Sequence, residues 1–116
     1  MSEQWLSGWI MYSKEMAQKL LIELLNLEGI LVSDGEHNWI RGIISIKEKL
    51  RMSIDSQGSE SASYYKDACD TWRSMYGGNG SFSDYHLWHD DYKERVKLNM
   101  PLDSIKCNIA KILDEE

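Results

Sequence analysis

The strongest constraint on the fold is the spacing of the apolar residues, which recur every three or four positions along most of the chain. Residues 5–27 are predicted to form one long amphipathic helix. Its apolar face carries Trp5, Trp9, Met16, Leu20, Leu24 and Leu27, widened by Leu21 and Leu25. We expect this helix to end at Glu28-Gly29, because glycine commonly ends a helix in the left-handed conformation.

A second helix is predicted to begin at Ser33-Asp34-Gly35-Glu36, which has the form of a capping box. In such a box the serine oxygen accepts a hydrogen bond from the first turn, and the glutamate reaches back to the serine amide. The apolar face of this helix consists of Trp39, Ile43, Ile46, Leu50 and Ile54, widened by Ile40 and Ile44. The polar, glycine-marked residues 55–61 then form a connection.

Two further helices are predicted. The third has the face Tyr65, Ala68, Cys69, Trp72, Met75 and Tyr76 and is stopped by Gly77-Gly78. The last begins at Pro101, which fits the first helical position, and its face is Leu102, Ile105, Ile109, Ile112 and Leu113. Between them we expect an irregular glycine-rich segment, and Tyr92, Val96 and Met100 suggest an additional short helix.

Strand signals are weak, and amphipathic helices with short connections bury their apolar faces against one another. The sequence therefore predicts an all-α fold, a compact bundle of four main helices in a single domain of residues 1–116. No run of about 18 apolar residues is present, and the start lacks the order of a secretory signal. Cys69 and Cys107 have no metal-type spacing and are interpreted as free thiols, so we expect a cytoplasmic protein without a membrane span.

The net charge of −6 argues against nucleic acid or an anionic membrane as a partner and favours a cationic one. The acidic excess is concentrated between residues 55 and 91. That segment has seven acidic residues against Lys66 and Arg73: Asp55, Glu60, Asp67, Asp70, Asp84, Asp90 and Asp91.

The densest part of this segment, residues 76–92, offers several chemical interpretations. His86 and His89 would share one face of a helix and could bind a metal, but the attested helical zinc motif spaces its histidines by four. The run from Gly77 to Ser81 lacks the lysine of a phosphate loop. Adjacent carboxylates such as Asp90 and Asp91 diverge on a helix, which favours an acidic helix start. We predict no catalytic residue, metal or cofactor.

Trp88 differs from the other four tryptophans because it lies among histidines and carboxylates instead of on an apolar stripe. Two interpretations remain open at this point. Trp88 could anchor an interface, where aromatic rings bury area and acidic groups select a basic partner. It could equally pack under the loop as a satellite of the core.

The block Tyr76-Gly77-Gly78-Asn79-Gly80-Ser81-Phe82-Ser83-Asp84, followed by Asn99-Met100-Pro101-Leu102-Asp103, resembles a family of small bacterial proteins. Those proteins resemble the immunity proteins of polymorphic and contact-dependent toxin systems, which neutralise a cognate toxin domain by binding it. The resemblance covers roughly the C-terminal third of the chain, and Asn79 stands where a larger apolar residue is expected.

The resemblance implies an immunity protein for a basic toxin domain, such as a nuclease. The expected partner-binding residues are Asp84, Tyr85, Trp88, His89, Asp90 and Asp91. Gly77, Gly78 and Gly80 are expected to reverse the chain at positive φ, with Ser81 or Ser83 capping the next element. The alternatives are a metal-dependent enzyme or hydrolase that uses His86 and His89, and a regulatory helical interaction module.

Overall fold

The computed structural model describes residues 2–77 and 81–114, with side chains from residue 14 onward. Within these residues it contains the helices α1 (Ser2–Asp34), α2 (Ile40–Asp55), α3 (Ser59–Tyr76) and α4 (Tyr92–Asp114), and no strand. A short 3-10 turn, η1 (Phe82–Asp84), precedes α4. The predicted all-α bundle of four main helices is therefore confirmed.

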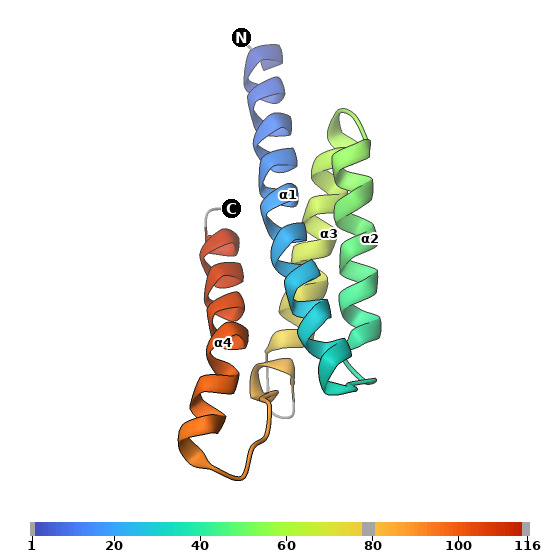
Figure 1. Ribbon diagram of the computed structural model, residues 1–116. Coiled ribbons are helices and arrows are strands. Elements are labelled where there is room, and N and C mark those ends of the chain that lie inside the picture. Colours follow the sequence, from blue (N-terminus) through green and yellow to red (C-terminus); the bar gives the residue numbers. More distant parts are fainter. Residues whose placement is uncertain (1, 78–80, 115–116) are drawn as a thin grey trace.

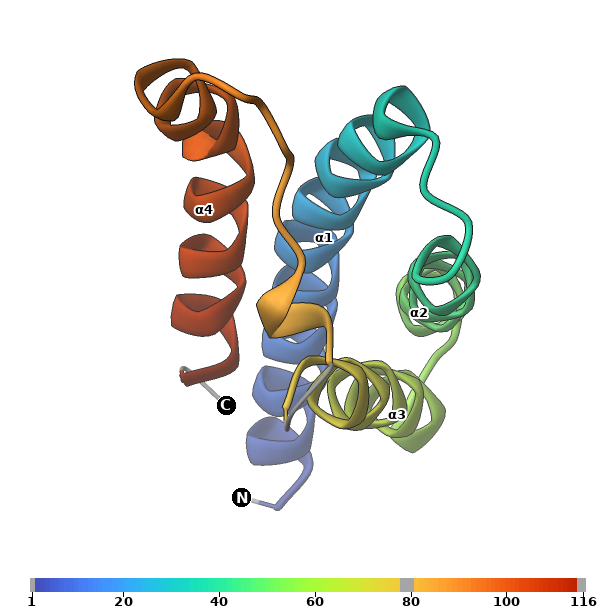
Figure 2. The ribbon, with the colours of Figure 1, turned by 90° about the horizontal axis from the view of Figure 1, so that it is seen from below.

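The long helix α1 is the axis of the molecule, which measures 59 × 24 × 22 Å. Helices α2 and α3 form an antiparallel pair that packs on one side of α1, and α4 lies on the other side (Figures 1 and 2). Since α4 packs mainly against α1, it has fewer helical neighbours than the rest of the bundle. No helix among the described residues is long and apolar enough to cross a membrane.

The predicted apolar faces meet in one core. Its fully buried members include Met16, Leu20, Leu24, Leu27, Leu31, Ile43, Ile46, Leu50, Cys69, Phe82, Leu102 and Ile109. Trp72 is buried and Trp39 packs against the core, as predicted, whereas the side chains of Trp5 and Trp9 lie outside the described ones. Cys69 is buried and Cys107 is exposed, and neither forms a disulfide.

Helix α1 does not end at Glu28-Gly29, so that prediction is wrong. It continues through Gly29 because Leu31 extends the buried stripe. Burying a leucine contributes about 1.5–3 kcal/mol, which outweighs the roughly 1 kcal/mol that a glycine costs inside a helix. The glycine that ends α1 is Gly35, at φ +71°. The N–H of Glu36 donates to Leu31 O and that of Gly35 to Val32 O, the pair of bonds of a Schellman motif.

The predicted capping box at Ser33-Asp34-Gly35-Glu36 is wrong, because α2 begins at Ile40 and only Glu36 of the four residues caps it. Ser33 belongs to the last turn of α1, so it does not cap α2. Glu36 alone caps α2: its carboxylate accepts from the backbone N–H groups of Asn38, Trp39 and Ile40, the last two at 2.8–3.0 Å. A carboxylate at a helix start also interacts favourably with the helix dipole.

Pro101 lies inside α4 instead of beginning it, so the predicted start of the last helix is also wrong. The short helix suggested by Tyr92, Val96 and Met100 is the first part of the same helix. Because proline has no N–H, residue 101 donates no helical hydrogen bond to the Lys97 carbonyl, and proline bends helices at such points. The start of α4 accordingly lies at an angle to the remainder (Figure 1).

Candidate functional site

Phe82, the only phenylalanine of the chain, fixes the segment that leads to the candidate site. It is fully buried, and its ring centroid lies 5.6 Å from that of Trp39, 5.7 Å from that of Trp72 and 5.5 Å from that of Tyr85. Aromatic rings at these separations attract one another beyond their buried area. Phe82 therefore anchors the chain to the core after α3.

The serine and the first glycine of this block act differently from the prediction. Ser81 Oγ donates to the Tyr76 carbonyl at 2.8 Å and pairs with Ser83 Oγ at 2.9 Å, so its side chain caps the end of α3. Ser81 is also the N-cap residue of η1, but its side chain makes no capping bond there. Gly77 has φ −87°, which any residue adopts, so its expected positive φ is wrong. Gly78, Asn79 and Gly80, the other residues of the predicted turn, lie outside the described residues.

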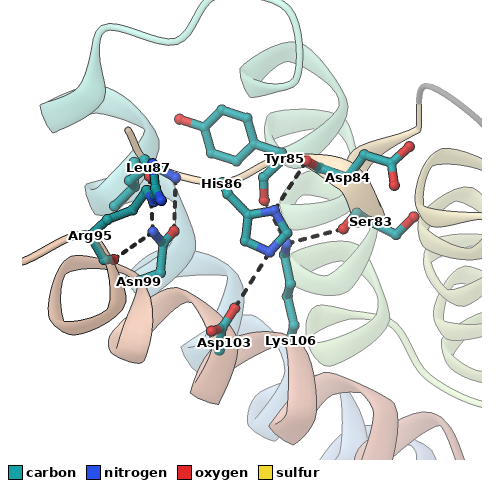
Figure 3. Close-up of polar contacts among 9 residues, drawn as sticks. All are labelled: Ser83, Asp84, Tyr85, His86, Leu87, Arg95, Asn99, Asp103 and Lys106. Carbon is teal, nitrogen blue, oxygen red and sulfur yellow. Dashed lines mark hydrogen bonds and ion pairs between the residues drawn. The ribbon is translucent and has the colours of Figure 1, made fainter. Parts of the chain in front are cut away.

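Two side chains of α4 hold the irregular residues 85–91 in place (Figure 3). The Asn99 amide accepts from the Leu87 N–H at 2.8 Å and donates to the Leu87 carbonyl at 2.9 Å. The Lys106 ammonium donates to the Tyr85 carbonyl at 2.7 Å and to the Ser83 carbonyl at 3.4 Å. Both backbone groups of Leu87 are thus paired, and its side chain is buried.

Burial affects the titration of two groups in this segment. It lowers the pKa of Lys106, and the nearby carboxylates of Asp103 and Asp84 oppose this shift. It raises the pKa of Tyr85, and the hydroxyl's hydrogen bond to the Asp34 carboxylate raises it further. Tyr85 was predicted as a contact residue; the structure shows that it also ties this segment to the end of α1.

The two histidines of the metal interpretation lie in an irregular segment and not on one helix face. His86 Nδ1 is 3.1 Å from the Asp84 carbonyl oxygen, and its Nε2 is 3.8 Å from the Asp103 carboxylate. His89 Nδ1 instead accepts from the Asp91 N–H at 3.0 Å. Among the described residues, no three His, Cys, Asp or Glu side chains converge as a metal site would require.

Trp88 is 71% exposed, so the interpretation that it packs under the loop is wrong. Its Nε1–H donates to the Asp90 carboxylate at 3.1 Å. The Arg95 guanidinium lies 4.5 Å from the centroid of its ring and 5.5 Å from that of Tyr92. These contacts fix the orientation of an indole that remains largely exposed to solvent.

Sequence reasoning missed the exposed residues of α4 that come after Trp88. Tyr92, Val96 and Met100 are spaced by four residues, and their exposed fractions are 69%, 47% and 62%. The sequence analysis took this spacing only as a sign of a short helix and did not predict that these side chains would be exposed. Together with Trp88 these residues form an exposed apolar stripe, which we call the α4 stripe. In the sequence, the one sign of this stripe was the composition of residues 88–91, a tryptophan beside a histidine and two aspartates, which is typical of interfaces.

The predicted acidic residues flank the α4 stripe. Asp91 caps α4, since its carboxylate accepts from the N–H groups of Lys93 and Glu94 at 2.8 and 3.2 Å, in keeping with the predicted acidic helix start. Asp90 and His89 are exposed beside it. Of the six predicted contact residues, Trp88, His89, Asp90 and Asp91 thus come together at the start of α4. Asp84 and Tyr85 lie closer to Phe82 and the end of α1.

Models of known protein families give no match to this sequence, and neither curated proteins nor solved structures match it. Its function must therefore be argued from the site itself.

Proposed function

We propose that this chain is an immunity protein, which binds and neutralises a cognate bacterial toxin domain with a basic surface, such as a nuclease. The observation that carries the proposal is the exposure of Trp88 together with Tyr92, Val96 and Met100 on one side of α4. Several large apolar side chains next to one another are costly to leave in water, and on soluble proteins such patches commonly mark a protein-binding surface. Tryptophan and tyrosine are also the residues most enriched at the energetic centres of interfaces.

The charge around the α4 stripe supports a basic partner. Asp90 and Asp91 are exposed at its start, and the chain as a whole carries a net charge of −6. Opposite charges accelerate diffusional encounter and disfavour wrong partners. A nuclease must present a cationic cleft to hold phosphates, so carboxylates that take the place of phosphate would occlude that cleft. In this mechanism the aromatic rings provide the buried contact area.

The test is complex formation with the toxin domain encoded by the reading frame next to that of this chain. The two should co-purify, and the full chain should restore growth of cells that express the toxin domain. Replacing Trp88 with alanine should weaken the complex by about 2 kcal/mol or more if the indole is a hot spot. Because Trp88 is largely exposed, the same change should alter the free energy of unfolding by less than about 0.5 kcal/mol.

Trp72→Ala is the matched control. Trp72 is buried in the core, so its truncation should lower the free energy of unfolding by about 3–5 kcal/mol. Binding is measured by calorimetry and unfolding by urea titration. The proposal fails if the neighbouring domain neither binds nor is neutralised, or if Trp88→Ala destabilises the fold without weakening a complex that does form.

A further inference from the structure

A concave surface separate from the α4 stripe lies between α4 and α1. It is a groove of about 570 Å³, and its lining consists of Asn26, Gly29, Ile30, Ser33 and Asp34 of α1, Leu87, and Leu98 and Pro101 of α4. Most of the lining is apolar, and Leu98 is 43% exposed. A space of this size can hold one large aromatic side chain or two aliphatic ones.

Gly29 is a feature of this groove that the fold does not explain. It lies in the interior of α1 and its φ is not positive, so the backbone does not require glycine. A Cβ atom added there would meet nothing within 4 Å, so close packing does not require it either. A glycine in a helix interior is less favourable than alanine. Its effect is to leave the α1 wall of the groove bare.

The groove has an acidic end. Asp34 lies in its lining, and Glu36 is close enough to the Tyr85 hydroxyl to contribute to the raised pKa of Tyr85. The same end contains the C-terminus of α1, where the helix dipole is negative. A cationic group seated beside Asp34 would thus interact favourably with both.

We propose that this groove receives a bulky apolar side chain of a basic polypeptide segment, with a neighbouring arginine or lysine placed beside Asp34. The inference rests on the proposed function, since it assigns the groove to the toxin domain as a contact site separate from the α4 stripe. A second copy of this chain is a poorer occupant, because two molecules of net charge −6 repel each other.

The experiment uses the isotope-labelled full chain and three synthetic tripeptides, followed by nuclear magnetic resonance. The probe is acetyl-Arg-Trp-Arg-amide; acetyl-Glu-Trp-Glu-amide reverses its charge, and acetyl-Arg-Ser-Arg-amide lacks the apolar side chain. We expect the probe to shift the signals of Ile30, Leu98 and Gly29, and to bind about ten-fold more tightly than either comparison peptide.

Two variants test the two halves of the site. Gly29→Leu places a side chain in the groove and should weaken binding of the probe about ten-fold by steric exclusion. The same variant should raise the midpoint of thermal unfolding, because leucine favours helix more than glycine does. Asp34→Asn keeps an acceptor for the Tyr85 hydroxyl but removes the charge, and it should reduce the preference for the arginine peptide. Gln18→Leu adds an exposed leucine elsewhere on α1 and should leave binding unchanged.

The inference is overturned if the probe shifts the signals of Trp88 and Tyr92 instead of those of the groove, or if Gly29→Leu binds it as tightly as the wild type. These results are separable from the test of the proposed function. A toxin complex that is weakened by Trp88→Ala but not by Gly29→Leu would overturn the groove alone. A groove that binds the peptide in a chain that neutralises no toxin would overturn the proposed function and the assignment to a toxin domain, and would leave the groove as a site for a basic segment with a bulky apolar side chain.

Discussion

Individual side chains in residues 84–91 have two distinct roles. Tyr85 and Leu87 hold the segment: one is hydrogen-bonded to Asp34 through its hydroxyl, and the other is paired with Asn99 through its backbone. Trp88 projects into solvent and is steadied by Asp90 and Arg95. The anchoring residues therefore present the exposed indole at a fixed place, which lowers the entropy that binding would cost.

The Tyr85 hydroxyl gives a pH-dependent prediction. Tyr85→Phe removes its bond to Asp34 and should lower the free energy of unfolding near neutral pH by about 1 kcal/mol. The folded-state pKa of Tyr85 is raised, so above pH 10 the folded protein keeps a proton that the unfolded chain loses. Rising pH then favours the unfolded wild type, whereas the variant lacks this contribution. The difference between the two proteins, measured by urea unfolding, should therefore shrink above pH 10.

Both proteins in this comparison contain Lys106, so its effect cancels. The pKa of Lys106 is lowered in the folded state, and its own contribution makes stability rise with pH up to its ordinary value of 10.5. A difference between wild type and Tyr85→Phe that stays constant from pH 7 to pH 11 would contradict the assignment of the hydrogen bond to Asp34.

For single residues, the sequence indicated which positions are important better than it indicated their backbone conformation or exposure. The four residues from Ser33 to Glu36 fit both a helix start and a helix end. Because Leu31 is buried, α1 continues to this point and the four residues mark its end. Gly35 therefore takes the positive φ that was expected of Gly29 at the end of α1. The composition around Trp88 did not decide whether its side chain is buried or exposed. Exposure depends on which helix lies beside it, and the local sequence does not contain that information.

Among the helices, α4 differs along its length. Its second half packs Leu102, Ile105 and Ile109 into the core. Its first half is joined to the rest of the molecule mainly through the hydrogen bonds of Asn99. The exposed residues of the α4 stripe face solvent. The bend expected at Pro101 separates the two halves. The first half is thus positioned by polar bonds to residues 85–91 more than by apolar packing.

Asn99 is the test of that arrangement. Its amide also donates to the Arg95 carbonyl at 2.9 Å, so Asn99→Ala removes three hydrogen bonds and leaves the buried Leu87 backbone groups unpaired. We expect the free energy of unfolding to fall by about 2 kcal/mol or more. The amide of Leu87 should also exchange its hydrogen faster, as measured by nuclear magnetic resonance.

Asn108→Ala is the matched control on the same helix. Asn108 makes a 3.3 Å bond to Glu23 and is only half-buried, so its loss should cost less than about 1 kcal/mol. It should leave exchange at Leu87 unchanged. Equal effects of the two substitutions would mean that Asn99 does not position the segment.

The number and type of the helices could be predicted because a 3.6-residue period reports burial directly. Their boundaries could not. Glycine and proline are usual at helix ends, but inside a helix they cost only about 1 and about 3 kcal/mol, and tertiary contacts can exceed that. Leu31 extends α1 past Gly29 in this way, and α4 continues through Pro101, its first half held by the Asp91 cap and the Asn99 bonds.

In the whole molecule, the two candidate contact surfaces, the α4 stripe and the groove, lie at the same end. The start of α4, the segment before it and the C-terminus of α1 lie together there, while the connection between α2 and α3 lies at the opposite end (Figure 1). The α4 stripe and the groove occupy different sides of α4 at this end. A single partner could therefore reach both of them around α4, with Asp34, Asp90 and Asp91 beside its contact area.

This arrangement predicts that association with a basic toxin domain depends on salt. The association rate constant should fall by about ten-fold or more between 0.05 and 0.5 M NaCl, because salt shortens the range of charge attraction. The dissociation rate constant should change much less, since it depends on the close contacts. Both are measured by stopped-flow mixing of the full chain with the toxin domain.

The charges responsible can be located with conservative substitutions. Asp90→Asn keeps an acceptor for the Trp88 indole and Asp91→Asn keeps a helix cap, so the double variant removes two charges with little change in structure. It should associate more slowly at low salt and show a weaker salt dependence. Asp55→Asn, at the opposite end, changes the net charge by half as much and should alter the rate only slightly. If Asp55→Asn slows association as much as the double variant does, net charge rather than its position steers the encounter, and the contact surface lies elsewhere.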